Sequence, residues 1–402
     1  MFLQVLIVLL AAKALGRVLR VFSQPPVIGE MAAGFVLGPI VFGWIAPEWQ
    51  LQLFGPGRLG ELKGLGQLGL VLFMFLMGAE LQLDGQAGRR HLRASGTIAG
   101  FGLLLPMLLG LAIAGPLHAA MAPPGIAYGP FVLFVATALS VTALPVMARI
   151  LKERDLAHSE PGRLALSAAA LTDGVAWLLL AGIVAAARPT GGGGLVLALV
   201  LLLAFCGLVF GVVRPLVARW LARGAVTAAG LGVLLIGALA CAWVTELLEV
   251  HAAFGAFLFG LSLPRDTKLA AALVERVEPV VLLVLMPCFF VLAGLGTTAR
   301  AFAGTGPFVV GLVLCAAIVG KVVAGVVGAR LAGESWRASL VVGALMNTRG
   351  VTEIIFLKVG LDVGLIGPEL FTALFITALV TTLMTSPALA LLSRGALKPL
   401  HA

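Results

Sequence analysis

The chain has 402 residues, of which 61% are hydrophobic and only 11% are charged. Soluble domains of ordinary composition carry about 45–50% apolar and about 25% charged residues, so this composition excludes a soluble enzyme, a disordered regulator and a disulfide-stapled secreted domain. The net charge of +9 comes from 27 basic and 18 acidic residues. Because basic residues gather in the cytoplasmic loops of membrane proteins, this charge does not by itself indicate a nucleic-acid partner. The composition predicts an all-α membrane protein.

Thirteen apolar segments are predicted to span the membrane, since a bilayer core needs about 20 predominantly apolar residues per helix. In chain order they cover approximately residues 2–22, 26–45, 62–82, 94–115, 127–151, 162–187, 195–218, 225–247, 250–264, 277–296, 306–331, 336–359 and 366–392. About ten residues follow the last segment, too few to fold alone, so no soluble regulatory domain is expected.

The basic residues divide unevenly between the two sides of the predicted membrane. Loops after odd-numbered segments, together with the C-terminal tail, hold nineteen Lys and Arg residues, whereas loops after even-numbered segments hold five. The positive-inside rule therefore predicts a multi-pass chain with its N-terminus outside and its C-terminus in the cytoplasm. This bias accounts for the net charge without nucleic acid. The four cysteines are scattered without metal-ligand spacing, and no cofactor is expected.

Short motifs recur at an offset of seven segments. The second segment reads GEMAAGFVLGP (29–39) and the ninth reads GAFLFGLSLP (255–264), while the third contains FMFLMG (73–78) and the tenth FFVLAG (289–294). An odd offset gives the two halves opposite orientations in the membrane. Inverted repeats are typical of secondary transporters, whose sites lie near the bilayer midplane.

Polar residues interrupt the fifth and twelfth segments, which predicts a matched pair of broken helices. An unwound helix exposes carbonyls and hydroxyls that can coordinate a cation, and its half-helix ends carry partial charges. Ser140 and Thr142 suit the first break. The second break holds Asn347, Thr348, Arg349, Gly350 and Glu353. Arg349 and Glu353 are expected to compensate opposing half-helix ends; the alternative is an ordinary i,i+4 pair in an unbroken helix.

Asp173 and Lys321 lie in the middle of predicted spans, where an ionisable residue costs about 2.5–3.5 kcal/mol on insertion scales. Asp173 follows a run of small residues in LSAAALTDGVAWLLLAG. We interpret it as a carboxylate that alternately holds a proton and a cation; a structural ion pair or packing hydrogen bond is the alternative. Lys321 is its expected charge partner, with a purely structural salt bridge as the alternative. Glu30, near a span end, is expected to snorkel or cap a helix.

Six spaced stretches of the chain resemble the monovalent cation:proton antiporter-2 family. They are QPPVIGEMAAGFVLGP (24–39), LVLFMFLMGAEL (70–81), ALSVTALPVMARILKERDL (138–156), TDGVAWLLLA (172–181), HAAFGAFLFGLSLPRD (251–266) and GALMNTRGVTEIIFLKVGLDVGLI (343–366). The DGVAW and MNTRG motifs are similar to those of bacterial relatives of the plant cation/proton exchanger branch. The resemblance covers about residues 3–393.

The resemblance implies a sodium/proton antiporter-type fold with inverted repeats and two crossing broken helices. It also implies a homodimer in a bacterial inner membrane. The ion-binding core is expected to comprise about residues 62–187 and 277–393, and the dimerisation scaffold about residues 1–45 and 195–264.

The family's ion-binding aspartate matches Asp173, and its buried lysine matches Lys321. The preceding position, often Asp or Asn in relatives, is Thr172 here. The site therefore has one carboxylate, whereas relatives with two carboxylates are suited to electrogenic exchange. One-for-one electroneutral exchange is expected here.

The resulting hypothesis is exchange of Na⁺ or K⁺ for a proton at Asp173 by alternating access, with Thr172, Ser140 and Thr142 supplying oxygen ligands. A cation channel could use the same polar breaks, and a sodium-coupled organic-anion symporter could share the architecture. A non-transporting membrane subunit or sensor is a further alternative, but charges retained inside the membrane weigh against it.

Overall fold

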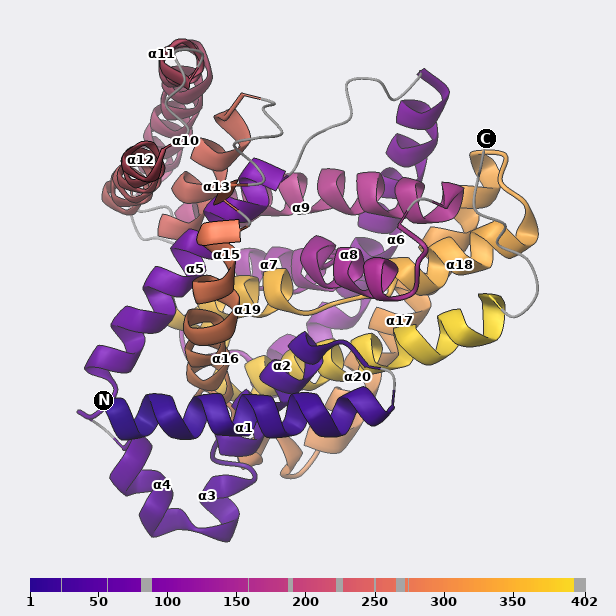
Figure 1. Ribbon diagram of the computed structural model, residues 1–402. Coiled ribbons are helices and arrows are strands. Elements are labelled where there is room, and N and C mark those ends of the chain that lie inside the picture. The colour runs from indigo at the N-terminus through magenta and orange to yellow at the C-terminus, as the bar shows by residue number, and fades with distance from the viewer. Residues whose placement is uncertain are drawn as a thin grey trace.

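The computed structural model describes residues 1–22, 24–55, 57–80, 89–157, 159–186, 191–221, 227–248, 251–264, 272–273 and 275–393. Within these ranges all regular secondary structure is helical (Figure 1). The first half contains α1 (Phe2–Val21), α2 (Pro26–Leu37), α3 (Phe42–Ile45), α4 (Pro47–Phe54), α5 (Gly60–Glu80), α6 (Arg89–Met121), α7 (Tyr128–Ser140), α8 (Leu144–Glu153) and α9 (Glu160–Ala186). The second half contains α10 (Gly191–Leu208), η1 (Val209–Val213), α11 (Arg214–Leu221), α12 (Ala228–Leu247), α13 (Ala252–Ser262), α15 (Glu278–Val280), η2 (Val281–Leu285), α16 (Met286–Leu295), η3 (Ala299–Phe302), α17 (Gly306–Leu331), α18 (Trp336–Met346), α19 (Val351–Asp362) and α20 (Pro368–Ser393).

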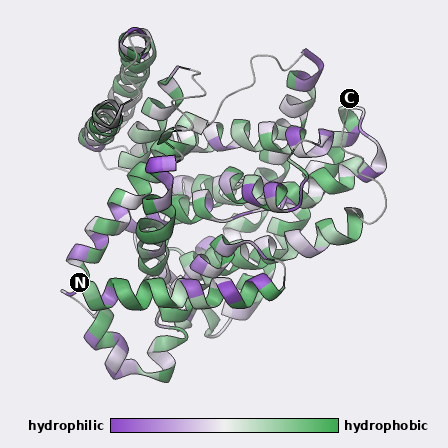
Figure 2. Cartoon of the chain, viewed as in Figure 1, coloured by the Kyte–Doolittle hydropathy of each residue, from purple (hydrophilic) through white to green (hydrophobic). Residues whose placement is uncertain are grey.

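The part of the chain that the structure describes contains twelve stretches long and apolar enough to cross a membrane. The remaining predicted segment, at about residues 250–264, forms the shorter apolar helix α13. Large apolar side chains point outward from α1 and α12, including Phe2, Leu10, Ile236 and Trp243. Figure 2 shows that much of α1 is coloured as hydrophobic. The prediction of an all-α, multi-pass membrane protein is confirmed.

The second span covers residues 26–45 as predicted, but its helix is not continuous, because α2 ends at Leu37. Gly38 is extended, with φ −73° and ψ 176°, and Pro39 follows it. A residue that precedes proline is disfavoured in the helical region, so this pair stops the helix. The chain then forms the short helices α3 and α4, which extend away from the bundle in Figure 1.

Two close helix crossings relate the two halves of the chain. At the first, α2 meets α16, and a Cβ added at Gly294 would lie 1.8 Å from the carbonyl oxygen of Gly34. At the second, α5 meets α13, and a Cβ added at Gly260 would lie 3.0 Å from the Cα of Gly78. All four glycines belong to the repeated motifs. A repeat at an offset of seven segments makes these two crossings equivalent to one another.

The helices pack in two groups (Figure 1). Helices α6 to α9 pack with α17 to α20, whereas α1, α2, α5, α13 and α16 pack with one another and α12 packs on α13. The segments predicted at residues 62–82 and 277–296 were grouped with the ion-binding helices. In the structure, α5 packs chiefly on α13 and α16 packs chiefly on α2, where the glycine crossings lie.

Candidate ion-binding site

The two predicted breaks meet inside the bundle. Helix α7 stops at Ser140 before α8 begins, and α18 stops at Met346 before α19 begins. The N–H of Ala143 in the first break donates a hydrogen bond to the carbonyl of Thr348 in the second, over 3.1 Å. Gly350, at φ 146°, adopts a backbone conformation that only glycine tolerates readily. Four half-helix ends therefore converge on one buried crossing.

Asp173 lies on α9 with 5% of its surface exposed, and it faces the starts of both second half-helices. Its Oδ2 accepts hydrogen bonds from the backbone N–H of Leu144, which opens α8, and from Oγ1 of Thr352, in the first turn of α19, each over 3.4 Å. Helix N-termini carry partial positive charge and stabilise anions. Oδ1 of Asp173 is buried and forms no hydrogen bond with the described residues. One carboxylate oxygen is thus held by two donors, and the other has no hydrogen-bond partner among the described residues.

Lys321 is fully buried on α17 and faces the end of the first half-helix. Its Nζ donates to the carbonyl of Ser140, to Oγ1 of Thr142 over 2.6 Å and to the carbonyl of Gly102 over 3.0 Å. The three ammonium protons therefore have three acceptors. Among the ion pairs of the described residues, none joins Lys321 directly to Asp173. The ammonium instead neutralises the negative, C-terminal end of α7.

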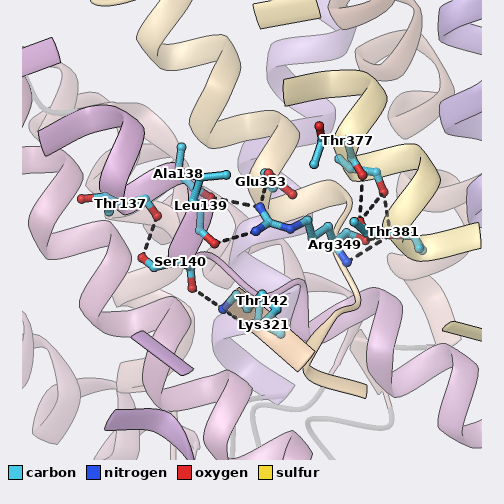
Figure 3. A network of polar contacts seen from close by, with 12 residues as sticks. Thr137, Ala138, Leu139, Ser140, Thr142, Lys321, Arg349, Glu353, Thr377 and Thr381 are labelled. Carbon is cyan, nitrogen blue, oxygen red and sulfur yellow. Dashed lines mark hydrogen bonds and ion pairs between the residues drawn. The ribbon is translucent and has the colours of Figure 1, made fainter. Parts of the chain in front are cut away.

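Arg349 and Glu353 form a fully buried ion pair, with Nη1 of the arginine 2.5 Å from Oε1 of the glutamate (Figure 3). The same guanidinium donates to the carbonyls of Ala138 over 3.2 Å and Leu139 over 2.5 Å. These carbonyls lie in the last turn of α7, while Glu353 lies in the first turn of α19. Each charge thus lies at a half-helix end of opposite partial charge, and the pair also has i,i+4 spacing.

The hydroxyls predicted as cation ligands are partly committed to other partners. Oγ of Ser140 donates to the carbonyl of Thr137 over 2.7 Å, and Oγ1 of Thr172 donates to the carbonyl of Ala169 over 2.9 Å. Both oxygens keep lone pairs. Oγ1 of Thr142 accepts the Lys321 ammonium instead, as described above. A cation bound to the remaining lone pair of Thr142 Oγ1 would therefore lie beside the positive charge of Lys321, which disfavours this role while the ammonium is in place.

Helix α20 holds the second break through threonines that the sequence analysis did not single out. Oγ1 of Thr382 accepts from the N–H of Arg349 over 3.0 Å and donates to its carbonyl over 2.6 Å. Nδ2 of Asn347 donates to the carbonyl of Thr381 over 3.3 Å. Thr381 and Thr382 belong to the run TALVTTLMTS (377–386), whose hydroxyls are unusually dense for an apolar span. This density of hydroxyl groups could have indicated from the sequence that the last span contributes to the site.

Two further residues were missed or misplaced. Thr352, which contacts Asp173, lies in the predicted break but was not chosen. Glu30 was expected to snorkel or cap a helix near a span end; it lies near the start of α2, as expected, but it is only 9% exposed.

Two crossing broken helices around a buried carboxylate define the architecture of a secondary transporter. The profile of the family described as "Sodium/hydrogen exchanger, transmembrane" matches residues 5–393. The chain belongs to this family.

Named relatives agree with this assignment. The chain is 36% identical to Cation/H(+) antiporter 17 of Arabidopsis thaliana, over 96% of this chain and 47% of that protein. It is 33% identical to the Na(+)/H(+) antiporter NhaS4 of Synechocystis, over 95% and 94% respectively. It is 31% identical to K(+)/H(+) antiporter 1 of Saccharomyces cerevisiae, over 96% and 45%. The chain thus spans about half the length of the plant and yeast relatives, and almost all of the cyanobacterial one.

A solved structure shares the fold. The sodium proton antiporter MjNhaP1 from Methanocaldococcus jannaschii superposes with a TM-score of 0.66, covering 97% of this chain and 98% of that one. The sequence identity is 14%, so this likeness concerns the fold alone.

Proposed function

We propose that this chain is a secondary antiporter that exchanges a monovalent cation, Na⁺ or K⁺, for a proton by alternating access. The observation that carries the proposal is Asp173, whose Oδ1 is buried without a hydrogen-bond partner among the described residues, while its Oδ2 is held at two half-helix starts. The antiporters of plant, cyanobacterial and yeast origin among its relatives support the same activity.

Competition at one carboxylate couples the two fluxes. A proton or a cation can occupy Asp173, but not both, and an empty charged carboxylate is costly to move through an apolar barrier. Movement is therefore restricted to the loaded carrier. When the proton is exchanged for a cation on the opposite side, each half-cycle carries the same charge, which gives one-for-one electroneutral exchange.

The oxygen ligands of the cation come from the crossing. Oδ1 of Asp173 is the first, and the hydroxyl oxygens of Thr352 and Thr172 and carbonyls of the breaks are further candidates. Thr142 is a less favourable ligand, because its Oγ1 already accepts from the Lys321 ammonium. Water completes the coordination shell.

Alternating access requires one group of helices to move against the other. We assign α6 to α9 and α17 to α20 as the moving, ion-binding body, because both broken helices, Asp173 and Lys321 all lie there. Helices α1, α2, α5, α12, α13 and α16 form the scaffold through which the chain forms a homodimer. We place the N-terminus outside and the C-terminus in the cytoplasm of a bacterial inner membrane.

Exchange by purified protein in proteoliposomes tests the proposal. An outward gradient of Na⁺, K⁺ or Li⁺ is imposed, and a dye inside the vesicles reports pH, with and without a voltage clamp by a non-transported ion. We expect cation-dependent pH change that is insensitive to voltage in the wild type and absent in Asp173→Asn. Asp173→Asn keeps the side-chain shape, so its elution profile and thermal unfolding should match those of the wild type.

Other outcomes would overturn the proposal. Exchange that persists in Asp173→Asn would remove this residue from the mechanism. Rapid uncoupled cation flux would identify a channel, and flux that requires an organic anion would identify a symporter.

A further inference from the structure

The third acceptor of the Lys321 ammonium comes from the interior of a helix. Helix α6 runs from Arg89 to Met121, and a carbonyl inside such a helix normally accepts from the N–H four residues later. Four residues after Gly102 stands Pro106, which has no N–H. The carbonyl of Gly102 is thereby left without its helical donor, and Nζ of Lys321 donates to it over 3.0 Å.

Close helix packing brings the lysine to this carbonyl. Pro106 is buried, and it faces Gly320, the residue that precedes Lys321. A Cβ added at Gly320 would lie 3.1 Å from the Cα of Pro106. Helix α17 therefore approaches α6 closely at the proline, one residue before the lysine.

The same arrangement occurs a second time in the chain. Pro387 lies inside α20, and the carbonyl four residues before it belongs to Leu383. Nε2 of Gln24 donates to that carbonyl over 3.0 Å. At Pro106 and Pro387, two of the three prolines inside the described helices, a side chain from a distant segment takes the carbonyl that the proline leaves free.

We infer that Pro106 is a positioning residue for the exchange reaction: by withholding an N–H, it leaves the carbonyl of Gly102 to anchor the Lys321 ammonium at the end of α7. The inference rests on the proposed function. An ammonium anchored by Gly102, Ser140 and Thr142 stays at the negative half-helix end, and Oδ1 of Asp173 stays open to the transported ion. A less anchored ammonium is drawn toward Asp173, where it competes with the cation.

Pro106→Ala tests this inference, because alanine keeps the Cβ and supplies the missing N–H. The new N–H satisfies Gly102 within the helix and weakens the anchor of Lys321. We expect the cation concentration for half-maximal exchange to rise about three- to tenfold, the effect of losing one hydrogen bond. The maximal rate at saturating cation should stay near that of the wild type, since a competitor is overcome by excess substrate. The pH profile of exchange should also shift.

Pro116→Ala is the matched control, because Pro116 is an exposed interior proline of the same helix. It should change neither the half-saturating concentration nor the pH profile. A backbone ester at position 106, from the α-hydroxy analogue of alanine, lacks both the ring and the N–H. It should restore the wild-type values. Equal effects of Pro106→Ala and Pro116→Ala, or an ester variant that behaves as Pro106→Ala does, would overturn the inference.

Thermal unfolding separates this inference from the proposed function. The wild type, Pro106→Ala, Lys321→Gln and the double variant form a cycle that needs no transport. We expect Pro106→Ala to lower the unfolding temperature when Lys321 is present and to have a smaller effect when it is Gln. Additive effects would overturn the inference even if exchange is observed. If Pro106→Ala does not fold, recovery of folding in the double variant supports it, and failure of both contradicts it.

Discussion

Gln24 and Leu383 lie 359 positions apart, and Nε2 of Gln24 donates a hydrogen bond to the carbonyl of Leu383 over 3.0 Å. Gln24 stands between α1 and α2, whereas Leu383 belongs to α20. The bond therefore joins the two groups of helices that we propose to move against each other. Such a bond holds only one arrangement of the two bodies, so it biases the conformational equilibrium.

Replacing Gln24 by Leu should shift this equilibrium and lower stability by about 1 kcal/mol, the value of a typical hydrogen bond. Pro387→Ala gives Leu383 a helical donor and should make the glutamine dispensable. We therefore expect the effect of Gln24→Leu to shrink in the Pro387→Ala background. Thermal unfolding of the four variants measures this coupling, and additive changes would show that the bond carries no energy.

Thr352 should contribute to exchange through its hydrogen bond to Asp173. Thr352→Val keeps the shape but removes the hydroxyl, so we expect the half-saturating cation concentration to rise about three- to tenfold. Thr352→Ser should retain most of the wild-type affinity. Thr377→Val is the control, because Oγ1 of Thr377 donates only within α20, to the carbonyl of Ala373 over 2.8 Å. Ion-dependent exchange in proteoliposomes provides the measurement, and equal behaviour of the two valine variants would contradict the role of Thr352.

The glycine crossings should tolerate no added carbon. In Gly294→Ala the new Cβ would lie 1.8 Å from the carbonyl oxygen of Gly34, so the helices must separate. Overpacking of this kind costs about 1–3 kcal/mol, and occasionally more. Gly100→Ala is the control, since nothing lies within 4 Å of a Cβ there. Yield of monodisperse protein and its unfolding temperature should fall for the first variant alone.

The sequence analysis predicted the elements whose signal is local. A carboxylate within an uncharged apolar run identifies Asp173, and polar residues that interrupt such a run identify both breaks. The acceptors of Lys321 were not predicted, because two of the three are backbone carbonyls, 181 and 219 residues away in the chain. Asp173 was expected as its partner because side-chain charges are visible in a sequence. Carbonyls freed at a half-helix end or by a proline become visible only through their geometry.

The same limit applies to the packing partners of the third and tenth segments. Their hydropathy resembles that of any other span, and the glycines that join α5 to α13 and α16 to α2 act through backbone contacts. Repeated glycine motifs nevertheless indicated which segments are equivalent. Equivalence within a repeat does not reveal which helices touch.

The buried pair of Arg349 and Glu353 gives the last prediction. In Glu353→Gln the guanidinium keeps the carbonyls of Ala138 and Leu139 but loses its counter-charge in an apolar interior. Breaking a buried ion pair in this way typically costs about 3–5 kcal/mol. We therefore expect a large fall in the unfolding temperature, together with loss of exchange, because the two broken helices are no longer held together.

Helix α19 supplies its own control. Lys358 and Asp362 form a second i,i+4 ion pair on it, but their side chains are 26% and 54% exposed. Exposed pairs contribute about 0–1 kcal/mol, so Asp362→Asn should leave stability nearly unchanged. Thermal unfolding of the two variants in the same detergent compares two ion pairs of the same i,i+4 spacing, one buried and one partly exposed. Equal losses would mean that burial is not what makes the Arg349 pair important, and that its role in joining α7 to α19 has to be reconsidered.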